Sequence, residues 1–135
     1  MSQMYMELIL DHYRNPRNFG TLDLANIHAR DTNPLCGDVI EMQLRLDGQN
    51  RVEEVRFMGK GCAISQASAS MLTEAINGKS LGELKALTKQ DVLSLLGIQV
   101  SAVRLKCALL SLKVLKTGLY QYLGAALPAE DARLV

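Results

Sequence analysis

The sequence lacks tryptophan, and aromatic residues make up only 4 % of its 135 positions. Surfaces that stack on nucleic-acid bases depend on aromatic side chains, so this scarcity disfavours such a surface. An excess of charge of one sign is missing too, because 15 Lys and Arg residues against 14 Asp and Glu residues leave a net charge of +1. That balance supplies no field to attract nucleic acid or an anionic membrane. We therefore expect neither as a partner.

Long hydrophobic runs are also missing. No run of the sequence approaches the roughly 18 apolar residues of a membrane span, and Glu7 and Asp11 interrupt the apolar N-terminal stretch, unlike a signal peptide. The three cysteines, at positions 36, 62 and 107, are odd in number and far apart. A reducing compartment would keep them as thiols, so a disulfide framework explains them poorly. We expect a cytoplasmic protein.

The hydrophobic pattern predicts one α+β domain over residues 1–135. Residues 40–46 alternate between apolar and polar side chains, which is the period of a half-buried strand. Residues 51–58 alternate in the same way after a turn at residues 47–50, which predicts a β-hairpin. A short strand near residues 27–32 is possible. The first half of the chain should therefore hold a small antiparallel sheet.

Helical periodicity dominates the remainder of the chain. Residues 4–15 and 64–76 each carry an apolar stripe at helical spacing, and apolar residues from Leu105 to Leu119 trace a long amphipathic helix. Ser80 with Glu83, and Thr88 with Asp91, have capping-box spacing before two short leucine-bearing helices. We expect the tail after Pro128 to fray.

Each cysteine lies at a boundary between predicted elements. Cys36 occupies a turn, followed by Gly37 and Asp38, at the entry to the alternating strand. Cys62 lies in a strand-to-helix turn, where the positive end of the next helix lowers a thiol pKa. Cys107 lies early in the long helix between basic neighbours, which also favour thiolate. All three cysteines are predicted to be poised toward the thiolate form.

Thiolates select zinc or iron-sulfur clusters, and both usually have four ligands. Asp38 is the best candidate for the fourth, because it is two residues from Cys36 and a carboxylate oxygen can complete a tetrahedral zinc site. The alternative is that three isolated cysteines are small buried hydrophobic residues. Spacing alone leaves both interpretations open, since the sequence contains no CxxC pair.

Other polar residues have simpler interpretations. We expect His12 to be a core-edge histidine satisfied by a hydrogen bond, and His28 to be solvated. The serines at positions 65–70 are not in the Gly-x-Ser-x-Gly turn that presents a hydrolase nucleophile. We expect these small residues to allow close packing of a helix instead. The lysines at positions 106, 113 and 116 are expected on a solvated helix face. A cysteine-nucleophile hydrolase ranks last, since both histidines are N-terminal.

Four segments together resemble the U-type iron-sulfur scaffold family (IscU, SufU and the N-terminal domain of NifU) over nearly the whole chain. They are Ile9-Leu10-Asp11-His12-Tyr13 with Pro16-Arg17-Asn18 and Gly20; Asn33-Pro34 with Cys36-Gly37-Asp38; Gly59 with Gly61-Cys62-Ala63-Ile64-Ser65; and Arg104-Leu105-Lys106-Cys107-Ala108. The resemblance implies a SufE/NifU-like fold, in which a three-stranded antiparallel sheet packs against about five helices. It also implies one site at which Cys36, Asp38, Cys62 and Cys107 bind a zinc ion or a [2Fe-2S] cluster.

Within that family the residues are similar to two branches. The Gly-x-Gly-Cys-Ala-Ile-Ser segment and Lys106, immediately before the third cysteine, resemble SufU, whereas the 45-residue spacing from Cys62 to Cys107 is similar to IscU. The Pro-Pro-Val-Lys chaperone motif of IscU is not present. The resemblance implies a partner of a cysteine desulfurase (SufS/IscS-like) rather than a stand-alone enzyme. Cys36 is the expected sulfur acceptor and Cys107 the alternative, with apo iron-sulfur proteins as recipients.

Two other functions stay open at this point. A zinc-dependent sulfurtransferase of the SufU type would use the same four residues. A structural zinc-binding adaptor domain would also bind the metal but would transfer no sulfur, and its fold would depend on the metal.

Overall fold

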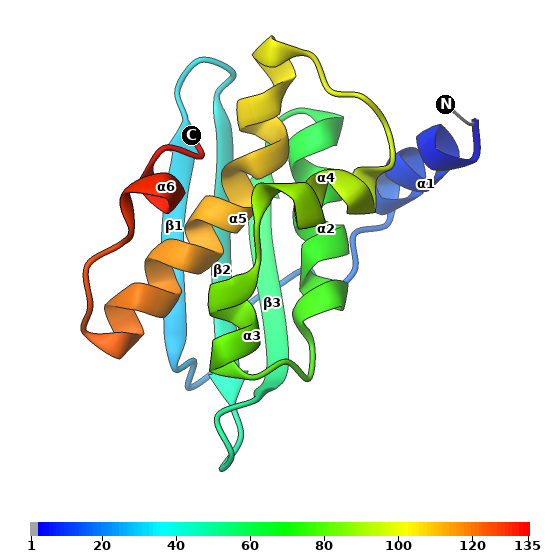
Figure 1. Ribbon diagram of the computed structural model, residues 1–135. Helices are drawn as coiled ribbons and strands as arrows, with labels where there is room; N and C mark the ends of the chain where they lie inside the picture. The colour runs from blue at the N-terminus through cyan, green and yellow to red at the C-terminus, as the bar shows by residue number, and fades with distance from the viewer. Residues whose placement is uncertain (1–2) are drawn as a thin grey trace.

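The computed structural model describes residues 3–135, in which three strands and six helices follow one another (Figure 1). They are α1 (Gln3–Arg14), β1 (Ile27–Asn33), β2 (Asp38–Leu46), β3 (Val52–Lys60), α2 (Ala63–Ile76), α3 (Leu81–Ala86), α4 (Lys89–Leu96), α5 (Ala102–Leu123) and α6 (Ala129–Ala132). The predicted α+β class and three-stranded sheet are confirmed. Both predicted capping boxes are present, at the starts of α3 and α4.

The sheet has the order β1-β2-β3, and both pairs of neighbouring strands are antiparallel. Val39 at the start of β2 lies opposite Lys60 at the end of β3, and Asn33 at the end of β1 lies opposite Asp38. This register brings the end of β1, the start of β2 and the end of β3 together at one end of the sheet. The turn that holds Cys36 and the turn that holds Cys62 are therefore neighbours.

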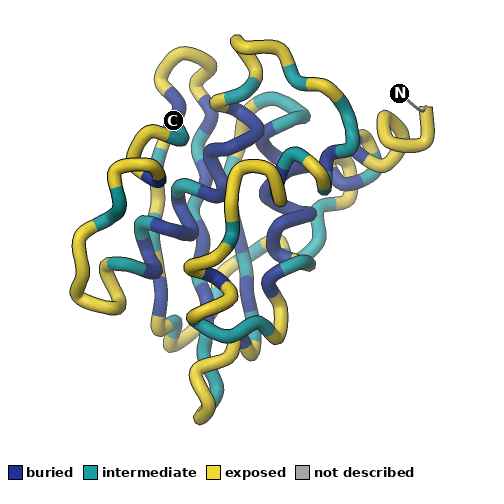
Figure 2. The backbone as a smooth tube through the Cα atoms, viewed as in Figure 1, coloured by how far each residue is buried: buried dark blue, intermediate teal, exposed yellow. Residues whose placement is uncertain are grey.

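One face of the sheet forms the core. The side chains of Ile40, Met42 and Leu44 on β2 are at most 1 % exposed, as the alternation predicted. Helices α2 and α5 cover this face, α2 against β3 and α5 against β1, so they form the second layer. The buried part of the chain runs along these two helices and the sheet behind them (Figure 2).

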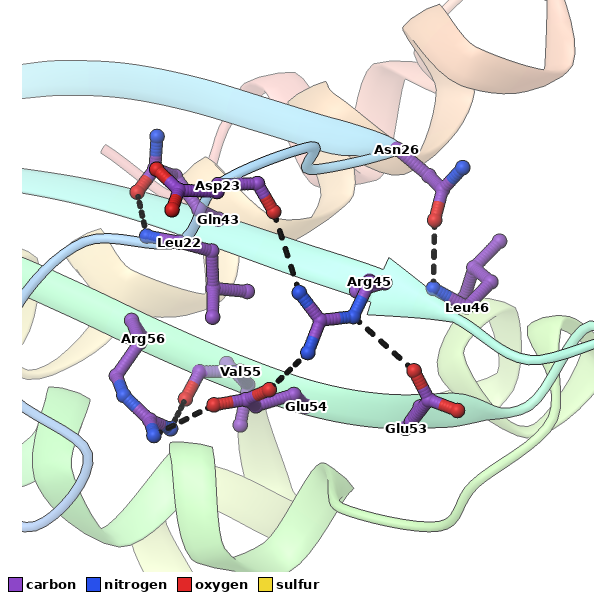
Figure 3. A network of polar contacts seen from close by, with 10 residues as sticks. All are labelled: Leu22, Asp23, Asn26, Gln43, Arg45, Leu46, Glu53, Glu54, Val55 and Arg56. Carbon is purple, nitrogen blue, oxygen red and sulfur yellow. Dashed lines mark hydrogen bonds and ion pairs between the residues drawn. The ribbon is translucent and has the colours of Figure 1, made fainter.

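The other face of the sheet carries polar side chains. Arg45 on β2 pairs with Glu53 at 3.0 Å and with Glu54, and Arg56 pairs with Glu54 at 2.6 Å (Figure 3). His28 is exposed, as predicted, and its Nε2 lies 2.5 Å from a Glu41 carboxylate oxygen. The Arg45 network lies at the end of the hairpin, away from the strand ends that hold the cysteines.

The C-terminal tail differs from the prediction. Residues Ala129–Ala132 form α6 instead of fraying, because Asp131 is only 8 % exposed and lies 3.8 Å from Nζ of Lys116. Lys116 is itself 2 % exposed and donates to the Lys85 backbone oxygen at 2.6 Å. The prediction of a solvated face was therefore wrong for Lys116, since its charge is satisfied by groups distant in sequence.

A buried polar cluster joins α1 to α2. His12 is 4 % exposed, and its Nδ1 lies 2.7 Å from Ser70 Oγ, which also accepts a hydrogen bond from the Arg17 backbone N–H. On the same helix, the Ser68 hydroxyl donates to the Ala108 backbone oxygen at 2.7 Å. The predictions of a satisfied core-edge histidine and of serines in helix packing are both confirmed.

The burial of His12 predicts a pH-dependent stability. Burial, together with the Arg17 charge, lowers the pKa of His12 below its ordinary value of 6.5. The unfolded chain therefore binds a proton that the folded chain does not, so stability is full above pH 6.5 and is lost as the pH falls below it. We expect the free energy of unfolding to decrease by up to about 1.4 kcal/mol per pH unit in this range.

Urea unfolding at a series of pH values measures this slope. His12→Gln should flatten it in this pH range. An equal slope in His12→Gln and the unmodified protein would contradict the assignment.

Candidate functional site

Four segments meet at the end of the sheet where the central strand, β2, begins. Among residues 3–135, ligand atoms of Cys36, Asp38 and Cys107 all lie within 4.8 Å of one another. Cys36 comes from the turn between β1 and β2, Asp38 is the first residue of β2, and Cys107 lies in the second turn of α5. The structure thus brings together residues that are 71 positions apart, and the Cys36 and Cys107 sulfur atoms are 3.3 Å apart.

Asp38 occupies the centre of this arrangement. Its side chain points inward from the sheet, as its parity with Ile40 predicted, and it is 0 % exposed. Its Oδ1 accepts a hydrogen bond from the Cys62 backbone N–H at 2.9 Å. Its Oδ2 is buried and has no hydrogen-bond partner within residues 3–135. A buried carboxylate oxygen in this state is costly unless a cation or a donor approaches it.

Cys62 lies beside the other three residues. It is the N-cap of α2, its side chain makes no capping hydrogen bond, and it is partly exposed. Its thiol is close enough to Cys107 to act on the pKa of that residue. The structure therefore places all four residues predicted from the sequence at one end of the fold, with Cys62 at the margin of the group.

Glycines at the end of β3 make this approach possible. A Cβ at Gly61 would lie 2.1 Å from Asp38 Oδ1, and Gly61 has φ of +144°, a conformation that other residues rarely adopt. A Cβ at Gly59 would lie 2.4 Å from the Val39 backbone oxygen. The Gly-x-Gly-Cys segment thus allows the β3–α2 turn to pack directly against the start of β2, which holds Asp38 in place.

Cys107 differs from its prediction. Burial raises the pKa of the Cys107 thiol far above its ordinary value, and the neighbouring side chains of Asp38, Cys36 and Cys62 raise it further. Arg104 and Lys106, which were expected to favour thiolate, are exposed while Cys107 is 0 % exposed, so their charges remain in water. The protein alone therefore holds Cys107 as a thiol.

Asn33 belongs to the site although the sequence analysis gave it no role. It is 1 % exposed, its Nδ2 lies 3.6 Å from Cys107 Sγ, and its Oδ1 has no partner within the described residues. Two sequence signals were present: Asn33 belongs to one of the segments that resemble the U-type scaffold family, and its position before Pro34 favours an extended backbone, which agrees with its place at the end of β1. Its contact with a residue 74 positions away could not be predicted from that signal.

The donor set fits a thiophilic metal. Three sulfur atoms and one carboxylate oxygen match the ligand preferences of zinc and of iron in clusters. Two tetrahedral sulfur ligands of one zinc ion are about 3.8 Å apart, and the Cys36–Cys107 separation of 3.3 Å is close to that value. A cation would also supply the missing partner of Asp38 Oδ2 and favour the Cys107 thiolate. The arrangement can therefore bind one metal centre.

Comparisons with known proteins identify the family of the chain. Residues 4–128 match the NifU-like N terminal domain family. SufU of Bacillus subtilis (strain 168), named a zinc-dependent sulfurtransferase, is 38 % identical over 87 % of this chain and 90 % of its own. IscU of Escherichia coli (strain K12), named an iron-sulfur cluster assembly scaffold protein, is 34 % identical over 87 % of this chain and 93 % of its own.

Solved structures share the fold. A protein from Fervidobacterium islandicum AW-1, described as an iron-sulfur cluster assembly scaffold protein for the SUF system, superposes with a TM-score of 0.73 at 28 % identity, over 88 % of this chain and 99 % of the other. The N-terminal part of a NifU-like protein from Brucella abortus superposes with a TM-score of 0.72 at 21 % identity, over 89 % of this chain and 94 % of the other. The resemblance noted in the sequence is confirmed, and the chain belongs to the NifU-like N-terminal domain family of iron-sulfur cluster assembly proteins, together with IscU and SufU.

Proposed function

We propose that this protein accepts sulfur from a cysteine desulfurase, assembles an iron-sulfur cluster and passes it to apo iron-sulfur proteins in the cytoplasm. Cys36, Asp38, Cys62 and Cys107 would hold the metal, and the protein would act as a partner of the desulfurase rather than as a stand-alone enzyme. The observation that carries this proposal is the buried Asp38 carboxylate, whose Oδ2 has no partner while two thiols lie within 4.8 Å. Membership of the family supports it, and no helix of residues 3–135 could span a membrane.

Sulfur would enter at Cys36. The Cys36 thiolate attacks the outer sulfur of the desulfurase persulfide, a new S–S bond forms on Cys36, and the electron pair of the broken bond leaves on the desulfurase cysteine. Cys36 is exposed on a turn whose neighbour Leu35 is 78 % exposed, whereas Cys107 is 0 % exposed. A cavity of about 380 Å³ beside this turn is lined partly by Lys113, which is paired with Asp31 at 2.9 Å, and by Lys106, whose charge favours the approach of an anionic sulfur donor.

Metal and acid-labile sulfide analysis tests the proposal. The protein is analysed as isolated, and again after anaerobic incubation with a cysteine desulfurase, cysteine and Fe²⁺. Iron and acid-labile sulfide should appear together after incubation. No bound metal under either condition would overturn the shared site.

The runner-up is a zinc-dependent sulfurtransferase, which the SufU-like residues around Cys62 and before Cys107 favour. In that case zinc should remain bound and persulfide should form, but no acid-labile sulfide should accumulate. A structural zinc adaptor would instead unfold when zinc is removed and would accept no sulfur. Circular dichroism after chelation distinguishes this third case.

The exposure of Cys36 predicts where persulfide forms. After treatment with a desulfurase and cysteine, an alkylating probe should label persulfide on Cys36, because Cys36 is the only one of the three cysteines that is exposed. Mass spectrometry of the digested protein locates the label. Cys36→Ser should abolish most of the labelling, and Cys62→Ser is the matched control that should retain it. Persulfide confined to Cys62 would contradict both Cys36 and the alternative, Cys107.

A further inference from the structure

A second cavity lies beside α5 and is separate from the proposed metal site. It has a volume of about 780 Å³, and its lining residues come from α5, from the α3–α4 segment and from the region of α6. Figure 1 shows α5 between the α3–α4 segment and α6. This volume is typical of a small-molecule site. None of the four candidate metal ligands lines it. The proposed function therefore leaves this cavity without a role.

The lining combines an apolar floor with an excess of positive charge. Leu87, Leu105, Leu109 and Leu134 contribute the apolar part. Five cationic side chains line the cavity, against two carboxylates: Lys85, Lys89, Lys106, Lys116 and Arg133, against Glu130 and Asp131. This leaves a net charge of 5 − 2 = +3 on the lining, in a chain whose total charge is only +1.

The charged side chains of the lining comprise a buried pair and exposed cations. Lys116, at 2 % exposure, already donates to the Lys85 backbone oxygen and lies 3.8 Å from Asp131, so this buried pair satisfies itself. Lys89 and Arg133 are exposed and come from different walls: Lys89 is the first residue of α4, and Arg133 directly follows α6. A ligand with an apolar body over the leucines would therefore place an anionic group between cations on both walls.

We infer that this cavity binds an amphipathic organic anion, that is, a small molecule with one carboxylate or sulfonate group and an apolar tail. Both parts are needed, because exposed cations alone bind anions weakly in water and an apolar tail alone gains nothing from the lysines. Leu105 and Lys106 precede Cys107, so the bound molecule would contact the turn of α5 that carries this thiol.

Three probes test the inference. Decanoate has both an anionic group and an apolar tail, decanol has only the tail, and inorganic phosphate is an anion without a tail. Each is titrated into ¹⁵N-labelled protein, and backbone resonances are followed by NMR. Decanoate should shift resonances around the cavity, on α5, α6 and the α3–α4 segment, and should bind at least about threefold more tightly than decanol. Phosphate should produce no saturable shift there. Equal binding of decanol and decanoate, or shifts centred on the exposed apolar side chains of α1, would overturn the inference.

A charge series provides the matched control. Lys89→Gln with Arg133→Gln removes two exposed cations from different walls and should weaken decanoate binding about threefold to tenfold. Arg14→Gln with Arg30→Gln removes two exposed cations outside the cavity and lowers the net charge equally, so it should not affect binding. An equal loss in both double variants would show attraction by net charge and would overturn the specific site. None of these readouts depends on metal binding, so they succeed or fail separately from the proposed function.

Discussion

Gly61→Ala is expected to lower the affinity of the protein for zinc by roughly 10-fold to 100-fold. The new Cβ would lie 2.1 Å from Asp38 Oδ1, so the carboxylate and the turn that carries Cys62 cannot both keep their positions. The hydrogen bond from the Cys62 N–H to Asp38 would be lost, and with it the link between two of the four proposed ligands. Competition for zinc with a chromophoric chelator measures the affinity.

Gly20→Ala is the matched control for this substitution. Gly20 has φ of +138°, close to that of Gly61, but a Cβ there would meet nothing within 4 Å. It therefore introduces the same type of backbone strain without a collision at the site. If Gly20→Ala lowers zinc affinity as much as Gly61→Ala, the effect comes from strain and not from the displacement of Asp38.

Asp38→Ala is expected to slow the transfer of a bound cluster to an apo-ferredoxin by about tenfold while leaving the fold intact. A carboxylate is a harder ligand than a thiolate, so it is the easiest of the four for water or an incoming thiol to displace. Without it, the protein loses the ligand at which the site opens. Anaerobic reconstitution, followed by the decay of the visible cluster absorbance and by ferredoxin assembly, measures the rate.

Asp38→Asn separates the two roles of this residue. An amide oxygen can still accept the hydrogen bond from the Cys62 N–H, but it is a much weaker metal ligand than a carboxylate. Slow transfer in both variants would assign the effect to the lost ligand, whereas slow transfer in Asp38→Ala alone would assign it to the lost hydrogen bond. Asp23→Ala removes an exposed carboxylate elsewhere and should change nothing. Faster transfer from Asp38→Ala than from the unmodified protein would refute this role.

The sheet and most helices could be predicted because their signals are local. The alternation along β2 and the capping boxes of α3 and α4 depend on residues within a few positions of each other. Even the inward direction of Asp38 followed from its parity with Ile40. These signals do not need the partner element to be known.

The errors concern contacts between distant residues. Lys116 has the sequence pattern of a solvated lysine, and only its contacts with Lys85 and Asp131 explain its burial. Those contacts also explain why α6 is ordered. The raised pKa of Cys107 was missed for the same reason. Its basic neighbours in sequence are exposed to water, whereas its neighbours in space are Cys36, Asp38 and Cys62.

The distance in sequence between the proposed ligands affects the lifetime of the protein. A metal held by both Cys36 and Cys107 acts as a removable cross-link that closes 71 residues of chain. A ligand that binds only the folded chain adds about 4 kcal/mol of stability when its concentration is a thousand times its dissociation constant. If these residues hold a metal as proposed, we expect molecules without it to open more often to proteases than loaded ones, so that turnover of the polypeptide would depend on the supply of metal.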